Sequence, residues 1–199
     1  MMRRRTLSLA LTAGLVSKAA SANDYPSRPV KVVVPISAGS ATDVVARLAA
    51  ESLREALSQP FLVDNRPGAG GSLGSAVVAK APPDGYTLLV VSSAHTANPA
   101  LYGSLPYDTA KEFRGITMLA TLPLILVVAP SGNIWSVKDL LALAKAKAGQ
   151  ITYASSGVGS ALHMGSEKFR AMAGFEGVHV PYRGTPEALT DVMAGRVDF

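Results

Sequence analysis

The chain has 199 residues and no cysteine, with 19 basic residues against 14 acidic ones. Without cysteine, neither disulfides nor thiolate metal sites are available. Residues 1–22 hold four of the basic residues and no acidic one, so the formal charge of +5 falls to about +1 once they are set aside. This balance argues against binding to nucleic acid or to a membrane surface.

The first 22 residues predict a cleavable export signal. A basic start (1–5) is followed by an apolar stretch (6–16) and by Ala20-Ser21-Ala22, the small-residue pattern of a cleavage site. The apolar stretch is shorter than the roughly 20 residues that span a bilayer. We therefore expect a periplasmic protein cleaved after Ala22. The general secretory route is favoured, and the arginines at 3–5 leave the twin-arginine route open.

Beyond the signal, strand-like and helix-like segments alternate, which predicts an α/β fold with parallel strands. The expected strands are 30–34, 61–64, 87–92, 151–154 and 178–182. The expected helices start at Thr42 or Asp43 and run to 57, and then cover 71–80, 137–147, 161–173 and 185–194. Ser136 with Asp139 predicts a capping box for the third of these helices, and Gly174 is expected to stop the fourth. A polar crossover at 101–115 leads to apolar runs at 116–120 and 124–129. A new strand begins at 196–199, and we expect the sequence to be a fragment of a longer chain.

Two loops rich in glycine and serine each lead from an expected strand into an expected helix. They are PISAGSATD (35–43) and SSGVGS (155–160). Backbone N–H groups and small hydroxyls at the positive end of a helix favour an anion. Ordinary strand-to-helix turns share this spacing, so spacing alone leaves both interpretations open. Without a catalytic base alongside, the pair indicates binding of one small anion rather than catalysis.

One glycine-rich stretch is similar to two sequence motifs of enzymes. Residues 70–74 match G-x-S-x-G, but that elbow must follow a strand directly, and the residues before it are a loop. The stretch lacks the Lys-Ser/Thr pair of a P-loop, and neither glycine loop spells G-x-G-x-x-G. A serine hydrolase that uses Ser72 or Ser160 with a histidine remains the alternative from another class.

The chain has three histidines, none with the spacing of a zinc motif, so we expect no metal or cofactor. His179 alternates with valines and is expected to be a strand residue. His95 and His163 each follow an expected strand, near the carboxyl ends where ligands collect in open α/β sheets.

Four segments, in the same order and spacing, resemble one family: 35–47, 63–89, 153–169 and 179–199. From Tyr25 to Phe199 the chain resembles the periplasmic substrate-binding proteins of tripartite tricarboxylate transporters, the Bug or TctC family. The resemblance implies the two-lobed, hinged type II periplasmic-binding-protein fold, with lobes at 23–105 and 106–199. It also implies capture of a small carboxylate by a monomer that serves transporter membrane subunits. A ligand-sensing partner of a signalling receptor would share the same cleft.

The family chain continues past Phe199, so the resemblance implies a fold that is incomplete at the C-terminus. Missing strands would expose apolar faces and an unpaired edge, and we expect poor folding or weak binding. A cooperative melt whose midpoint rises with added carboxylates would contradict this.

In the family, one loop from each lobe holds a ligand carboxylate through amides, hydroxyls and bridging waters. Ile36 and Ser40 stand where the family often has an aromatic residue and a glycine, so the pocket shape or ligand class is expected to differ. The ligand-binding residues that the resemblance implies are Ser37, Ala38, Gly39, Ser40, Ala41, Thr42, Asp43, Ser92, Ser93, His95, Ser155, Ser156, Gly157, Gly159, Ser160, His163, Tyr182 and Gly184.

Overall fold

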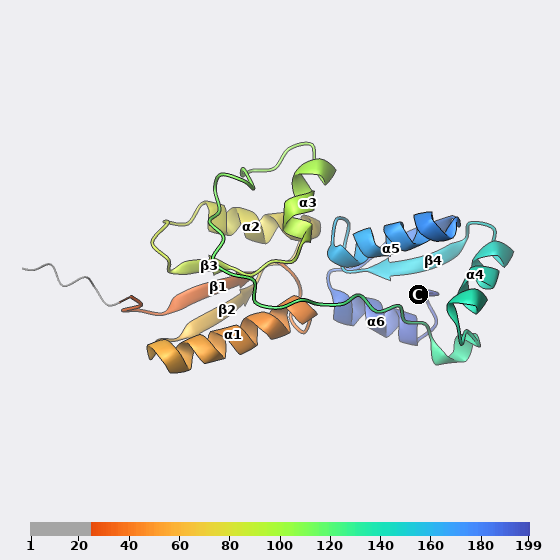
Figure 1. The fold of residues 1–199 in the computed structure, drawn as a ribbon, viewed down its shortest axis with the longest axis horizontal. Helices are drawn as coiled ribbons and strands as arrows, with labels where there is room; N and C mark the ends of the chain where they lie inside the picture. The colour runs from red at the N-terminus through yellow and green to blue at the C-terminus, as the bar shows by residue number, and fades with distance from the viewer. Residues whose placement is uncertain (1–24) are drawn as a thin grey trace, which may run out of the picture.

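The computed structural model describes residues 25–199, and it shows two α/β units that each have a parallel sheet (Figure 1). The expected export signal lies outside the described residues. Within 25–199, no helix is both long enough and apolar enough to cross a membrane.

The sheet of the first unit has β1 (Val30–Val34) at its centre, between β2 (Phe61–Asn65) and β3 (Thr87–Leu89). All pairings are parallel. Helix α1 (Ala41–Leu57) covers one face of this sheet and α2 (Ser72–Ala79) the other (Figure 1). A central strand between two helical layers is buried on both faces, which explains the run of valines in β1.

Three details of the first unit differ from expectation. The N-cap of α1 is Ser40, not Thr42 or Asp43, because Ser40 has extended backbone angles and Asp43 already lies in the first turn. Strand β3 stops at Leu89 and is only partly buried, since it lies at the edge of the sheet. A helix that was not expected, α3 (Ala94–Leu101), follows it.

The segment 102–129 carries the chain from the first unit to the second without a regular element (Figure 1). The apolar runs that it contains form no strand. Ile116, Met118 and Ile125 are each at least 75% exposed. These side chains form exposed apolar surface on the segment between the two units.

The second unit pairs β4 (Ile151–Ser155) with β5 (Gly177–Pro181), again in parallel. A short 3₁₀ turn (Pro130–Gly132) and α4 (Val137–Ala146) come before the sheet, and α5 (Ala161–Ala173) and α6 (Thr185–Met193) follow its strands. The last residues extend along β4, where Ala154 N donates to Phe199 O at 2.8 Å. The core forms where the side chains of α4 meet this sheet, and it includes Leu140, Ala144, Ile151, Tyr153, Phe175 and Phe199.

Helix ends in the second unit follow the sequence closely. Ser136 caps α4 by accepting the N–H of Asp139, as the predicted capping box requires. Helix α5 ends at Gly174 in the left-handed conformation. These two predicted helix ends are confirmed. Ser160 caps the start of α5 by accepting the N–H of His163.

Candidate ligand-binding site

A cleft of about 1920 Å³ lies between the two units. It is bordered by the end of β1, the start of α1, the segment after β3 and the loop between β4 and α5, so both sheets present their carboxyl ends to it. Ligand pockets usually measure about 300–1,000 Å³. The cleft is larger because it continues along residues 112–127.

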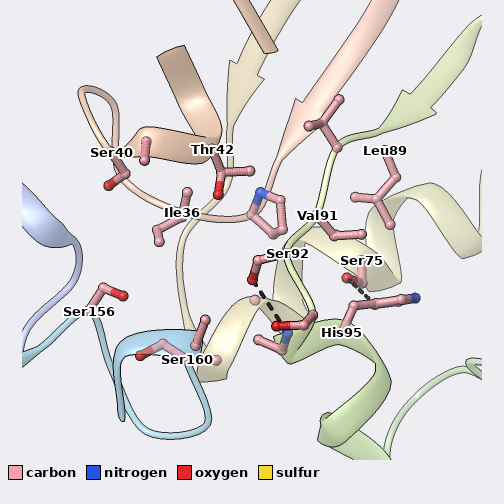
Figure 2. Close-up of a pocket in the computed structure, with 18 of the residues that line it drawn as sticks. Ile36, Ser40, Thr42, Ser75, Leu89, Val91, Ser92, His95, Ser156 and Ser160 are labelled. Atoms are coloured by element: carbon pink, nitrogen blue, oxygen red, sulfur yellow. Dashed lines mark hydrogen bonds between the residues drawn. The ribbon is translucent and has the colours of Figure 1, made fainter. Parts of the chain in front are cut away.

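The structure brings residues of both predicted loops to this cleft. Ser40 and Thr42 lie on one side of it, and Ser156 and Ser160 on the other, with Ser92 at one end (Figure 2). The predicted residues that line the cleft are Ser40, Ala41, Thr42, Ser92, Ser93, His95, Ser156, Gly157, Ser160 and Tyr182.

The first loop is fastened from inside by Asp43. This side chain is 2% exposed and accepts hydrogen bonds from Gly39 N (2.8 Å), Arg47 Nε (2.9 Å) and Asn65 Nδ2 (2.9 Å). Burial acts to raise the pKa of Asp43, but the hydrogen bonds from Arg47, Gly39 and Asn65 hold it below the ordinary value. Asp43 is therefore ionised, and it shapes the loop instead of lining the cleft.

In the second loop, the amides of two glycines donate hydrogen bonds that hold the loop in place. Gly157 N donates to Ser155 Oγ at 3.1 Å, and Gly159 N donates to His163 Nδ1 at 3.2 Å. Both glycines have positive φ, which other residues adopt only at a cost. The expectation of unpaired glycine amides is thus wrong for Gly39, Gly157 and Gly159. The N–H groups that helix geometry leaves available belong to the first turns of α1 and α5.

The two units touch on one side of the cleft through the first loop and the start of α6. Ser37 Oγ donates to Arg183 O at 2.9 Å, and Thr185 N donates to Ser40 Oγ at 3.4 Å. A Cβ on Gly184 would lie 2.7 Å from Ser37 Oγ. Ser37 and Gly184 are therefore placed in a contact between the units, not in the lining of the cleft.

The units also touch on the other side, at the second loop. Tyr102 OH donates to Val158 O at 2.9 Å, and a Cβ on Gly70 would lie 2.6 Å from that same oxygen. A Cβ on Gly159 would meet Leu101 at 3.1 Å. The two units therefore contact each other on both sides of the cleft.

The predicted histidines are not all directed at the cleft. The ring of His95 extends away from Ser156 and Ser160 (Figure 2), with Nδ1 3.2 Å from Ser75 Oγ. It packs edge-on against Phe113, and burial lowers its pKa. His163 lies beneath the second loop, outside the lining. The other predicted residues that do not line the cleft are the exposed Ala38 and Gly39 and the buried Ser155 and Gly159.

Sequence reasoning missed Asn98, a residue of α3 that lines the cleft and is 1% exposed. Its Nδ2 donates to Gly70 O at 3.2 Å, while its Oδ1 has no partner among residues 25–199. The Asn98-Pro99 pair is typical of a turn, so no local pattern predicts a helix here. Within the same residues, no group of three or more acidic or histidine side chains is arranged to hold a metal ion.

The two α/β units and the cleft between them match solved periplasmic binding proteins. A Rhodopseudomonas palustris protein solved with adipate has a TM-score of 0.84 and 38% identity, over 88% of this chain and 59% of that one. MatC from Rhodopseudomonas palustris with bound malate has a TM-score of 0.80 and 32% identity, over 87% of this chain and 60% of that one.

The model of the tripartite tricarboxylate transporter family receptor, TctC, matches residues 45–199, and the chain belongs to this family. A UPF0065 protein of Pseudomonas sp. (strain P51), encoded in the tcbD-tcbE intergenic region, is 39% identical over 99% of this chain. The chain spans 59% of the length of that relative. BugT of Bordetella pertussis is 37% identical, over 94% of this chain and 57% of that protein.

Proposed function

We propose that this chain belongs to a periplasmic solute receptor that holds a small carboxylate between its two units. One observation carries the proposal: α1 and α5 both begin at the cleft, and each brings serine or threonine hydroxyls to it. Two helix N-termini place positive partial charge at one point, where an anion is stabilised. The chain spans only 59% of its relatives' length, so the proposal concerns the ligand-contacting part.

Hydrogen bonds to the carboxylate can contribute enough free energy for a biologically useful affinity. Each hydrogen bond to a charged group contributes about 1.5–3 kcal/mol. Several such bonds from the first turns of α1 and α5 and from the hydroxyls of Ser40, Thr42, Ser156 and Ser160 support micromolar binding after ordering costs.

The cleft also has an apolar side that narrows the ligand class. Ile36, Leu89 and Val91 line it close to the hydroxyl groups (Figure 2). Methylene groups bury favourably against such side chains. The relatives solved with adipate and malate hold aliphatic dicarboxylates. We therefore propose a small aliphatic carboxylate as the ligand of this chain.

The proposal is binding without catalysis. Two serine–histidine pairs exist in the described structure, Ser155 with His179 and Ser75 with His95. Ser155 and His179 do not line the cleft, and His95 Nε2 has no partner among residues 25–199 that would orient its ring. Of the two predicted nucleophiles, Ser160 accepts the backbone N–H of His163, and Ser72 does not line the cleft. A nucleophile needs both a base and access to substrate. The hydrolase alternative is not favoured.

Calorimetry with adipate and malate tests the proposal, with adipamide as an uncharged control of equal length. We expect micromolar binding of at least one acid and none of the diamide. Thr42→Val, which removes one hydroxyl from the cleft, should weaken binding about tenfold. Ser52→Ala, which removes a hydroxyl from the exposed face of α1, is the matched control and should have no effect. Equal affinity for acid and diamide, or no binding of either, would overturn the proposal.

The cellular setting is part of the same proposal. We propose export with cleavage after Ala22, lobes at 23–105 and 106–199, a monomer in solution, and delivery of the ligand to transporter membrane subunits. Family membership supports the delivery step. Mass spectrometry of the periplasmic fraction tests the export signal, because a mature protein beginning at residue 23 is the expected product.

A further inference from the structure

Two histidines beneath the second loop have no direct part in the proposed ligand contacts. His163 on α5 and His179 on β5 stack with ring centroids 4.1 Å apart and planes inclined by 24°. Each also reaches the loop through a ring nitrogen. His163 Nδ1 accepts the N–H of Gly159 at 3.2 Å, and His179 Nε2 lies 2.6 Å from Ser155 Oγ.

The histidines are themselves supported by the core. His179 stacks on Tyr153 at 5.2 Å, and Tyr153 stacks on Phe199 at 5.6 Å. Tyr153 is 3% exposed and Phe199 6%. The four rings form a continuous column from the loop into the hydrophobic core. Because cores are close-packed, the column holds the loop in one position.

This support reaches the groups proposed to bind the ligand. Ser155, held by His179, accepts the N–H of Gly157. Gly159, held by His163, immediately precedes Ser160, the N-cap of α5. The direction of the first-turn amides of α5 therefore depends on both histidine contacts.

The contact with Gly159 requires a particular protonation state. A ring nitrogen accepts an N–H only through its lone pair, whereas an imidazolium carries a proton on both nitrogens. Protonated His163 would face the N–H of Gly159 with another N–H. Two imidazolium rings at 4.1 Å would also repel each other.

The other titratable groups around the pair do not remove this conflict. Glu167 on α5 is the acidic group that acts on the pair, but its carboxylate is bound by Tyr153 OH and, at 2.9 Å, by Arg170. Burial and the hydrogen bond to Glu167 raise the pKa of Tyr153 to about 12, so Tyr153 carries no charge near neutral pH.

Building on the proposed function, we propose that His163 and His179 are positioning residues for the ligand-binding loop and that protonation of the pair weakens ligand binding in acid. Neither histidine lines the cleft. Their effect on the ligand passes through Ser155, Gly157 and Gly159.

Two variants of His163 distinguish the effect of the hydrogen-bond acceptor Nδ1 from the effect of ring stacking. His163→Asn places an amide oxygen at the position of Nδ1 and does not titrate, whereas His163→Phe keeps the stacked ring without an acceptor. Affinity for adipate is measured at about pH 7.5 and about pH 5.5, on either side of the ordinary histidine pKa. We expect the asparagine variant to bind within about threefold of the original at the higher pH, and the phenylalanine variant about tenfold more weakly.

The pH comparison isolates the histidines from the titration of the ligand. Adipate titrates identically with every variant, so the ratio of two affinities at one pH cancels its ionisation. The original protein should lose about tenfold more affinity on acidification than His163→Asn. Lys168→Asn, on the exposed face of α5, controls for the helix propensity of asparagine and should keep the original pH profile. Parallel pH profiles for the original protein and His163→Asn would overturn the proposal.

Nuclear magnetic resonance of the ligand-free protein gives a readout that does not depend on binding. The amide signal of Gly159 should move as the pH is lowered in the original protein and stay in place in His163→Asn. If neither adipate nor malate binds, the proposed function fails, and this titration still decides the role of the histidines. A Gly159 signal that titrates equally in both proteins would show that His163 does not control the loop.

Discussion

The loop at 35–40 is fastened by an ionised carboxylate, whereas the loop at 155–160 is fastened by imidazole nitrogens. Asp43 holds the first through bonds to Gly39, Arg47 and Asn65, and its pKa lies below the ordinary value. His163 and His179 hold the second. Two loops with similar sequences and a shared cleft thus have different responses to pH, because a carboxylate anchor survives acid that protonates an imidazole.

Removal of the first anchor should have the largest effect. Asp43→Ala leaves three donors without their acceptor, so we expect the free energy of unfolding to fall by about 3 kcal/mol in urea titration. Asp108→Ala is the control, because Asp108 lies in an exposed turn and pairs with Lys111 on the surface. This variant should cost much less, because exposed ion pairs contribute little to stability. Equal losses for the two variants would show that Asp43 is not an anchor.

Disrupting the contact between the first loop and α6 should have the second-largest effect. Gly184 has a φ of −171°, which any residue adopts, so an alanine there is opposed by its neighbours and not by its backbone. Its Cβ would lie 2.7 Å from Ser37 Oγ across the contact and 3.0 Å from Glu187 Oε2 on α6. Overpacking of this kind costs about 1–3 kcal/mol, and Gly184→Ala should weaken carboxylate binding at least about fivefold. Small-angle scattering should show a larger radius of gyration. Gly103→Ala, with nothing within 4 Å of the new Cβ, should change neither property.

The pH dependence of the free energy of unfolding should distinguish the histidine contacts from those of Asp43. We expect this effect to be smaller than the two above. Burial lowers the pKa of His95 and, with the nearby His163, the pKa of His179, so the unfolded chain binds more protons in acid. Stability should be complete above about pH 6.5, the unfolded histidine value, and should decline below it. Asp43 adds its own loss only as the pH falls through about 3.8 and lower.

Urea titrations from about pH 7.5 to about pH 5 measure the histidine part, because the loss from Asp43 begins only at lower pH. His179→Gln, which keeps a polar group near Ser155 and cannot titrate, should flatten part of the decline. A decline of unchanged slope in this variant would assign the effect to His95 alone.

The smallest effect is expected at the second loop's contact with α3. Tyr102→Phe removes one hydrogen bond to Val158 O, worth about 1 kcal/mol, and should weaken ligand binding a few-fold. Tyr25 OH donates to Gly85 O at 2.7 Å within the first unit, and this bond does not join the two units, so Tyr25→Phe is the matched control. Indistinguishable affinities for the two variants would show that the contact does not assist closure.

Local signals in the sequence were reliable where one residue decides the structure. Ser136 with Asp139 and Gly174 each mark a helix end through their own hydrogen bonds or backbone angles, and each lies where predicted. The family and the α/β fold were also correct, because several motifs in fixed order support them.

Predictions that depended on distant partners were less accurate. The apolar runs near Ile116 and Ile125 resemble strands, but strand formation needs a neighbour, and the described structure gives them none. Helix α3 was not predicted because it contains Pro99, and proline is disfavoured inside helices. The role of Asp43 could not be predicted from the sequence either. Asp43 lies in α1, whereas its partner Asn65 lies 22 residues away, at the end of β2.

The segment 102–129 is the single covalent connection between the two units within residues 25–199. A connection of this kind makes every contact between the units intramolecular, and short flexible linkers give effective concentrations in the millimolar range. The Ser37–Arg183 and Tyr102–Val158 hydrogen bonds are individually weak and would not join two separate chains. On one chain they meet repeatedly at high local concentration, so a small ligand needs to add only a modest free energy to keep the units together.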